Sequence, residues 1–376
     1  MIDRRLLHDF DWVMLALTLG LAGAGAVGVY SATHGAGGVS PMFYDHLGRL
    51  GVGLAAMLVA TAIDYHIILH YAWLAYGAGI AALVAVDVVG MVGMGAQRWL
   101  SLGVVSIQPS EFFKLALVLV IAAFFSGLRK PSPFSLADIW PIAAATAVPF
   151  LLVVKQPDLG TALIIAGIFV IMLFVAGVEL RLFGWVFGGG IGVAAASFGL
   201  NALGLLNPQW FLREYQLRRI RVLFNPELDP LGAGYHINQS KIAIGSGGLA
   251  GKGFLQGTQS GLNFLPQQHT DFIFSVVSEE WGLIGALSVI ALMALLILWA
   301  VQTARGARDF AGSLLAMGVA TIFFLHCAVN IAMTTGIMPV VGLPLPLLSY
   351  GGSSVLTTFA GIGLIMNVKM RRYVYG

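Results

Sequence analysis

The sequence predicts an all-α polytopic membrane protein with ten transmembrane helices and one long extracytoplasmic loop. Of its 376 residues, 58% are hydrophobic and only 10% are charged, whereas soluble domains carry about a quarter charged residues. A membrane-spanning helix takes roughly 20 apolar residues, and the chain offers ten apolar runs of about that length. Its one cysteine, Cys327, lies inside such a run, which excludes a disulfide scaffold. We therefore expect residues 1–376 to form a single integral membrane domain.

The expected spans are joined by short connections, with one exception. They fall near residues 12–31, 48–63, 68–90, 110–127, 139–155, 159–178, 183–204, 272–301, 312–336 and 347–368. The exception is the long segment 205–270, which separates the seventh and eighth spans. Because the number of spans is even, both termini should lie on the same side of the membrane.

Lys and Arg orient the expected spans, because short cytoplasmic segments are richer in these residues than short outer segments. On one side the short segments hold ten of them, namely Arg4, Arg5, Arg129, Lys130, Arg181, Arg305, Arg308, Lys369, Arg371 and Arg372. On the other side they hold three, namely Arg49, Arg98 and Lys155. This predicts cytoplasmic termini and an outer 205–270 loop. The net charge of +3 is too small to indicate a nucleic-acid partner.

Within the long loop, residues 210–224 are predicted to form an amphipathic helix. Apolar residues alternate there with four arginines, Arg213, Arg218, Arg219 and Arg221. Such a helix tends to lie in the headgroup plane, where its cations meet phosphate groups, and Asn225-Pro226 would end it. A solvated charged face without any ligand explains this composition equally well.

The functional candidates are ionisable residues at the ends of the spans, since burying a charge in hydrocarbon is costly. Asp271 directly precedes the eighth apolar run, and an isolated Asp at this place would be interpreted as a helix N-cap. Glu279 and Glu280 follow about 12 Å deeper, at 1.5 Å per residue. A polar stripe therefore enters the membrane below Asp271, and a cap alone does not explain it.

Charged residues also begin the fourth expected span. Glu111 and Lys114 stand at i and i+3 and can pair on one helix face. A structural ion pair is the favoured interpretation over direct catalysis. Arg98 and Trp99 lie on the preceding outer loop, where Trp99 could be only an interfacial residue.

Two further outer segments could line the same outward-facing cavity. The hairpin after the fifth span holds Lys155 and Asp158, although Asp158 is also a typical helix-start residue. The last outer segment, 339–354, is rich in Pro and Gly, so we expect a re-entrant or broken element whose backbone amides need partners. Asn330 and His326 lie one and two turns before it.

Two functions fit such a cavity. One is transport of a molecule with a polar head. The other is group transfer from a lipid diphosphate, which needs a general base and cations that stabilise the leaving group. Asp271 with nearby Arg and Lys residues supplies both, whereas a transporter would carry its charges at mid-membrane. The sequence therefore favours group transfer.

His66 and His70 lack a third ligand, so they are interpreted as interfacial histidines and not as a metal site.

Five motifs occur in order over nearly the whole chain. They are Gln97-Arg98-Trp99; Gln108-Pro109-Ser110-Glu111 with Lys114; Gln156-Pro157-Asp158-Leu159-Gly160-Thr161-Ala162; Gln268-His269-Thr270-Asp271 with Glu279-Glu280; and Pro344-Leu345-Pro346 with Ser349-Tyr350-Gly351-Gly352-Ser353. Together they resemble the SEDS family (shape, elongation, division, sporulation) of bacterial cell-wall proteins. The residues around the fourth and fifth motifs are more similar to the rod-shape-determining branch than to the division branch.

The resemblance implies a peptidoglycan glycosyltransferase of the bacterial plasma membrane. It would polymerise lipid II, the undecaprenyl-diphosphate-linked disaccharide peptide, during cell elongation, with Asp271 as the general base. Substrate would be bound by Arg98, Trp99, Glu111, Lys114, Lys155, Asp158, His269, Glu279, Ser349 and Ser353. A lipid II flippase, or a division-type paralogue, is the alternative.

The resemblance also implies a partner. The chain has no transpeptidase serine motif, so a class B penicillin-binding protein would crosslink the new strand within the elongation complex. No cofactor is expected to be obligatory. A divalent cation, Mg²⁺ or Mn²⁺, would enter bound to the substrate diphosphate, because the sequence holds no dedicated metal cluster.

Overall fold

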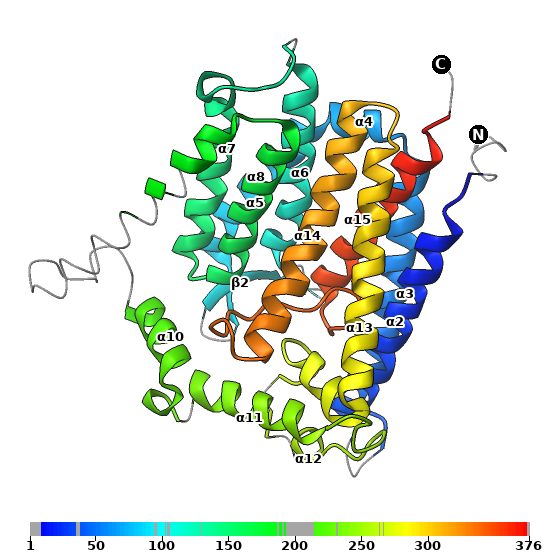
Figure 1. Ribbon diagram of the computed structural model, residues 1–376, viewed down its shortest axis with the longest axis vertical. Helices are drawn as coiled ribbons and strands as arrows, with labels where there is room; N and C mark the ends of the chain where they lie inside the picture. Colours follow the sequence, from blue (N-terminus) through cyan, green and yellow to red (C-terminus); the bar gives the residue numbers. More distant parts are fainter. Residues whose placement is uncertain are drawn as a thin grey trace, which may run out of the picture.

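The computed structural model of the chain is a bundle of helices (Figure 1). It describes residues 9–34, 38–93, 96–101, 103, 106–128, 130–185, 188–189, 192, 214–230, 232–262, 264–265 and 267–373. The helices are α2 (Trp12–Thr33), α3 (Pro41–Ala62), α4 (Tyr65–His70), α5 (Ala72–Val89), α6 (Pro109–Gly127), α7 (Leu136–Lys155), α8 (Leu159–Ala176), α10 (Glu214–Phe224), α11 (Ala233–Ser246), α12 (Thr258–Gly261), α13 (Ile273–Arg305), α14 (Phe310–Thr334) and α15 (Gly352–Met370). The strands β1 (Met91–Gly93), β2 (Ala96–Ser101) and β3 (Ser106–Ile107) form a small antiparallel sheet in that order.

Eight of the described helices are long and apolar enough to cross a membrane, namely α2, α5, α6, α7, α8, α13, α14 and α15. The polytopic helical class is thereby confirmed. Helix α3 has 22 residues but is less apolar, because Asp45, His46 and Arg49 lie in its first turns. Most of the expected span 183–204 lies outside the described residues, as do Arg4, Arg5, Arg129 and the start of the amphipathic helix up to Arg213.

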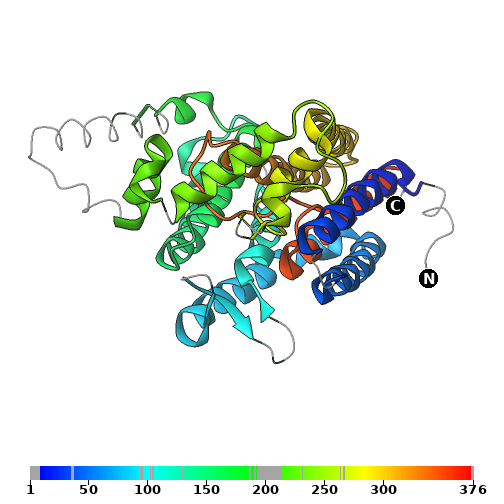
Figure 2. The same ribbon diagram turned by 90° about the horizontal axis from the view of Figure 1, so that it is seen from below.

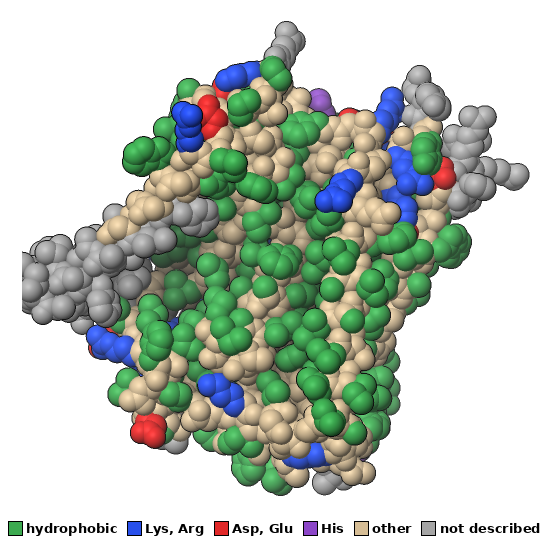
Figure 3. All heavy atoms as spheres, in the orientation of Figure 1, with side chains coloured by type: hydrophobic (Ala, Val, Ile, Leu, Met, Phe, Trp, Pro, Cys, Tyr) green, Lys and Arg blue, Asp and Glu red, His purple; other side chains and the backbone are tan. Residues whose placement is uncertain are grey.

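The amphipathic helix appears as α10, which ends at Phe224 before a short 3₁₀ turn. Figure 1 shows α10, α11 and α12 at one end of the bundle, with both chain termini at the other end. Figure 2 shows the same three helices from below, crossing the ends of the long helices. Hydrophobic side chains cover the middle of the bundle on the face drawn in Figure 3, while Lys and Arg gather toward its ends. This distribution fits a bundle embedded in a bilayer.

The starts of the helices follow ordinary capping chemistry. Asp11 accepts the backbone N–H of Met14 at 3.1 Å at the start of α2. Asp309 accepts the N–H of Gly312 at 2.7 Å at the start of α14. Each carboxylate satisfies a donor that the helix itself leaves without a partner, so the sequence fixes both starts locally.

The centre of the bundle is made of α6, α14 and α15. In their most apolar stretches 61%, 72% and 83% of the residues are buried, against 17% for α5 and 28% for α7. Helices α5 and α7 therefore lie at the lipid-facing periphery. The non-helical segment 339–351 between α14 and α15 is packed inside the bundle. It lies so close to α2 that a Cβ atom on Gly25 would stand 2.7 Å from the Cα atom of Leu348.

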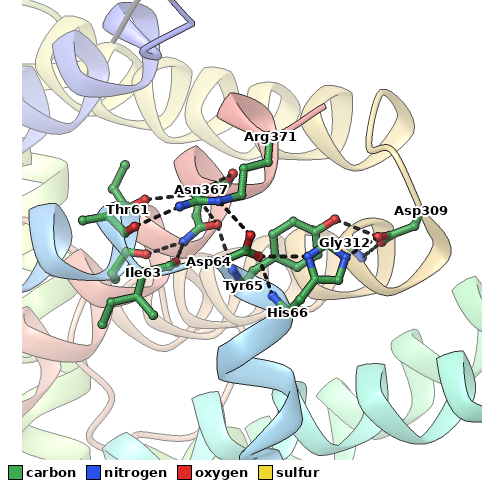
Figure 4. A network of polar contacts seen from close by, with 11 residues as sticks. Thr61, Ile63, Asp64, Tyr65, His66, Asp309, Gly312, Asn367 and Arg371 are labelled. Carbon is green, nitrogen blue, oxygen red and sulfur yellow. Dashed lines mark hydrogen bonds and ion pairs between the residues drawn. The ribbon is translucent and has the colours of Figure 1, made fainter. Parts of the chain in front are cut away.

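A network of polar contacts ties the helices together at the end that carries the termini (Figure 4). His66 lies between two carboxylates, with Nδ1 2.9 Å from Asp64 Oδ1 and Nε2 2.8 Å from Asp309 Oδ2. The Tyr65 hydroxyl donates to Asp309 at 2.8 Å. Helix α4 is thereby joined to the start of α14.

The same network contains a buried amide on α15. Asn367 Nδ2 donates to Ala60 O at 2.6 Å and also to Ile63 O, while its Oδ1 accepts the N–H of Tyr65 at 3.1 Å. Arg371 donates to the same Oδ1 at 2.7 Å. The end of α3 is therefore fixed against α15.

His66 should make the stability of this end dependent on pH. Burial lowers the pKa of His66, but the hydrogen bonds and charges of Asp64 and Asp309 outweigh burial and raise the pKa above its usual value. The stabilising charge is present below about pH 6.5, the pKa of an unfolded histidine, and is lost as the pH rises through the raised value. We expect His66→Gln to lower the melting temperature of the purified protein at pH 6 and to have little effect at pH 9. A difference that does not change with pH would contradict this explanation, and His70→Gln is the control.

Candidate functional site

Asp271 lies in a turn, residues 267–272, just before α13. The turn closes through a 3.0 Å hydrogen bond from the N–H of Thr270 to Gln267 O, and Gln267 has a positive φ of 52°. Helix α13 begins after Phe272 with no side-chain cap among the described residues. The N-cap interpretation of Asp271 therefore finds no hydrogen bond to support it.

The position of Asp271 is set by α14 and by the segment 339–351. Asn330 Nδ2 donates to the carbonyls of Asp271 at 2.9 Å and Leu343 at 2.7 Å. Gly342 has a φ of +72°, and a Cβ atom on it would stand 3.2 Å from Asp271 Oδ2. The carboxylate therefore lies directly over the backbone of Gly342, where a side chain would crowd it and be strained.

The segment 339–351 is non-helical, as its Pro and Gly content predicts. The Ser349 hydroxyl donates to Thr270 O at 2.6 Å and accepts the N–H of Leu345 at 2.8 Å. The N–H of Tyr350 donates to His269 O at 2.8 Å. His269 is partly buried, with its ring 5.6 Å from the Tyr350 ring in an edge-to-face contact. These contacts join the Asp271 turn to the broken segment along its length.

Arg98 and Asp158 lie close enough to Asp271 for their charges to act on it. Arg98, on β2, lies with Nη1 3.6 Å from Asp158 Oδ1 and donates to the carbonyls of Gln156 and Pro157. Asp158 caps α8 through the N–H of Thr161 at 3.2 Å. Its capping role is therefore present, together with its contact to Arg98. Trp99 follows on β2, opposite Met91 of β1, and is partly buried.

The electrostatic environment of Asp271 is unusual for a carboxyl group. Burial raises its pKa to about 6, a hydrogen bond from Thr270 and the charge of Arg98 oppose this rise, and the charge of Asp158 adds to it. A carboxylate with such a pKa is still ionised at neutral pH, yet it accepts a proton more readily than an ordinary Asp.

Ser353 connects this region to α6. Its hydroxyl accepts the backbone N–H of Gln108 at 3.0 Å, and Gln108 Nε2 donates to Asp158 Oδ2 at 3.4 Å. The first turn of α15 is thereby linked to the start of α6 and of α8.

Lys114 forms a buried triad below this region. Its Nζ lies 2.7 Å from Glu111 Oε1 and 2.7 Å from His326 Nε2. His326 Nδ1 is 3.2 Å from Pro344 O, so the triad reaches the broken segment. A small cavity beside it is lined by Pro346, Ser354, Thr357 and Thr358 among others. The predicted Glu111–Lys114 ion pair is present, but its third member, His326, was not among the predicted site residues.

His326 and Asn330 are the two site residues that sequence reasoning did not select. They are four residues apart on α14, and both contact carbonyls of the broken segment. Two polar residues at helical spacing in an apolar run were the available signal. The sequence did not show that the segment following α14 folds back onto this face.

Two predicted substrate-binding residues have other partners in the structure. Lys155 Nζ pairs with Asp87 Oδ2 on α5 at 3.0 Å, and its side chain is 66% exposed. Glu279 is fully buried and accepts from Lys252 Nζ at 2.6 Å and from the N–H groups of Thr258 and Gln259 at 2.8 and 2.9 Å. All the hydrogen bonds that the described residues give to Glu279 come from residues 252–260. Both contacts with substrate stay predictions.

A search of the described residues finds no group of three His, Cys, Asp or Glu side chains arranged to hold a metal ion. The involvement of a divalent cation remains a proposal.

Comparison with known proteins now places the chain. The model of a family of cell cycle proteins that includes FtsW, RodA and SpoVE matches residues 9–374. The chain belongs to this family. It is 43% identical over 366 residues to the peptidoglycan glycosyltransferase MrdB of Escherichia coli K12, covering 96% of this chain and 94% of that protein. Because the chain belongs to this family and eight of its described helices are long and apolar enough to cross a membrane, it is a multi-pass membrane protein.

Two solved structures are similar over the whole length. One, entitled "Structural coordination of polymerization and crosslinking by a peptidoglycan synthase complex", has a TM-score of 0.77 and 31% identity and covers 97% of this chain and 98% of that one. The other, the rod-shape-determining protein RodA of Thermus thermophilus, has a TM-score of 0.70 and 29% identity, with 97% and 98% covered. The resemblance to the rod-shape-determining branch is thereby confirmed.

Asn330 should matter for activity beyond its effect on stability. Asn330→Leu leaves two buried carbonyls without a donor, which costs about 1–3 kcal/mol each, and releases the Asp271 turn. Asn367→Leu is a matched control, because Asn367 also bridges two carbonyls, but at the far end of the bundle. At a similar loss of melting temperature, only Asn330→Leu should lower glycosyl transfer severalfold. An equal loss in both variants would indicate a purely structural role.

Glu279 should stabilise the 252–260 loop. Glu279→Gln places an amide N–H₂ among backbone donors and removes the charge that pairs with Lys252. We expect faster hydrogen exchange confined to residues 252–260, measured by mass spectrometry, with Asp138→Asn as the control, because Asp138 also pairs with a lysine and accepts a backbone N–H, but outside this loop. Unchanged exchange together with a raised KM for lipid II would instead support the predicted contact with substrate.

Proposed function

We propose that this chain is a peptidoglycan glycosyltransferase that polymerises lipid II into glycan strands during cell elongation. Its 43% identity over 96% of the chain to a protein of that activity supports the reaction class. The observation that carries the proposed mechanism is the position of the Asp271 carboxylate in a turn held by Asn330, Ser349 and Tyr350, where burial raises its pKa to about 6.

In the proposed reaction, Asp271 accepts the proton of the 4-hydroxyl of the acceptor sugar. The oxygen then forms a bond to the anomeric carbon of the donor sugar, while the bond from that carbon to the diphosphate breaks with inversion. Undecaprenyl diphosphate leaves with the electron pair. The elevated pKa favours this role, because general-base catalysis is most effective when the pKa of the base lies near the working pH.

Stabilisation of the departing diphosphate is assigned mainly to Arg98. Its charge already acts on Asp271, and its side chain is 20% exposed beside Asp158. Lys114, by contrast, is only 2% exposed and already paired with Glu111. We therefore assign Lys114 a structural role, in which its contact with His326 holds α6 against α14 beside the site. Mg²⁺ or Mn²⁺ would add to this stabilisation when bound with the diphosphate.

The proposed topology has ten spans, with α3 and the predicted span 183–204, most of which lies outside the described residues, added to the eight apolar helices. Both termini would lie in the cytoplasm and the Asp271 site on the extracytoplasmic face of the bacterial inner membrane. The location of α10 to α12 at the end opposite to the termini supports this arrangement (Figure 1).

The proposed partner is a class B penicillin-binding protein, which would crosslink the strands within the elongation complex. The similarity to a chain from a structure of polymerisation and crosslinking by a peptidoglycan synthase complex supports this partner. The predicted single domain of residues 1–376, with the loop 205–270 outside, is kept as part of the proposal.

Asp271→Asn should abolish polymerisation while leaving the fold intact, because the amide cannot accept the proton. Loss of a general base lowers rates by about 10²–10⁴-fold. The measurement is glycan strand formation from lipid II by purified protein with its partner, and Asp138→Asn, whose partners Lys130 and Ser135 are not among the predicted site residues, is the matched control. Translocation of labelled lipid II in liposomes without polymer would support the flippase alternative, and full activity of Asp271→Asn would exclude Asp271 as the base.

A further inference from the structure

A second cavity lies at the opposite end of the molecule from Asp271, near the start of α2 and the end of α15. It has a volume of about 210 Å³ and is lined by Trp299, Gln302, Thr303, Lys369 and Arg372. Trp299, Gln302 and Thr303 lie in the last two turns of α13, and Lys369 lies in the last turn of α15. The cavity is therefore at the level where these apolar helices leave the hydrocarbon.

Lys369 is held in one position within this cavity. Its Nζ lies 2.9 Å from Asp11 Oδ2 and 4.3 Å from the centre of the Trp299 ring. Asp11 is buried, and its two oxygens also accept Trp299 Nε1 at 3.1 and 2.9 Å. A carboxylate and an aromatic face thus fix the ammonium group, which retains N–H donors for another acceptor.

The lining suits an anion. It contains two cations, Lys369 and Arg372, together with the amide of Gln302. The Asp11 carboxylate that pairs with Lys369 at 2.9 Å is only 1% exposed and is not among the five lining residues. The C-terminal ends of α13 and α15 carry partial negative charge, which opposes the binding of an anion. Binding of an anion would therefore depend on the charges of both Lys369 and Arg372. Figure 3 shows Lys and Arg side chains gathered at this end of the bundle.

The surroundings of the cavity indicate that the anion is attached to a lipid. Leu295 and Leu298 on α13 are 52% and 62% exposed, one to two turns deeper than Gln302. Spacings of three and four residues place them on the same side of the helix as Gln302. Trp12, at the start of α2 beside Asp11, is 67% exposed. An apolar surface for acyl chains therefore continues directly from the cavity.

From this arrangement we propose that the cavity binds the phosphate headgroup of an anionic phospholipid of the inner leaflet, with its acyl chains along α13. Lys369 and Arg372 contact the phosphate, and Asp11 and Trp299 hold Lys369 in place. Such basic cavities between helix ends suit anionic headgroups. This site is separate from the proposed glycosyltransferase site and does not depend on it.

The test uses the full chain in nanodiscs of phosphatidylcholine, with and without phosphatidylglycerol. Phosphatidylglycerol should raise the melting temperature of the wild type, and native mass spectrometry should detect retained lipid. Arg372→Gln should weaken retention about fivefold, the effect of one cation near a membrane surface. Arg181→Gln, which changes an exposed arginine that does not line the cavity, is the control. Lys369→Arg should retain binding, because it keeps both the charge and the pair with Asp11.

Three results would overturn the proposal. One is the absence of any effect of phosphatidylglycerol on the wild type. Another is an equal loss of retention in Arg372→Gln and Arg181→Gln, which would indicate general surface charge. The third is equal stabilisation by millimolar inorganic phosphate in phosphatidylcholine alone, because the cavity would then take free phosphate and not a lipid.

Discussion

The contact between the turn 267–272 and the non-helical segment 339–351 is the constraint on which the site depends. Irregular backbone inside an apolar bundle must find hydrogen-bond partners within the protein, because hydrocarbon supplies none. Asn330 and Ser349 provide them by binding carbonyls of both stretches. Since each stretch satisfies groups of the other, neither can take up its conformation alone. Asp271 is fixed over Gly342 as a consequence.

This mutual support also explains the chemistry assigned to Asp271. The packing that satisfies the backbone also partly buries the carboxylate and raises its pKa to about 6, while a hydrogen bond from Thr270 and the charge of Arg98 limit the rise. The broken segment contacts the Lys114 triad as well, through Pro344 and His326. Changes to that triad would therefore reach the site through the backbone of the segment. Two of the residues predicted to bind substrate, Ser349 and Glu279, form hydrogen bonds that hold neighbouring backbone segments in place. Ser349 joins the turn 267–272 to the segment 339–351, and Glu279 holds the 252–260 loop.

Much of the fold follows from local sequence, and less of the site does. Apolar length predicts eight of the described helices, each long and apolar enough to cross a membrane. Asp309 and Asp158 cap the starts of α14 and α8, as is typical of Asp. The role of Glu279 could not be predicted, because its partners lie some twenty residues earlier in a glycine-rich loop. His326 and Asn330 gain meaning only from the fold-back of the segment after α14. Such pairings depend on tertiary packing, which periodicity along one helix does not encode.

The most direct test of the role of Asp271 is the pH dependence of kcat for strand polymerisation by the wild-type enzyme. A partly buried base with a pKa of about 6 predicts a rate that is level above pH 7. Below pH 6 the rate should fall about tenfold per pH unit, as the base becomes protonated. A rate that stays level down to pH 5, as expected for an ordinary Asp with a pKa of about 3.9, would contradict the account.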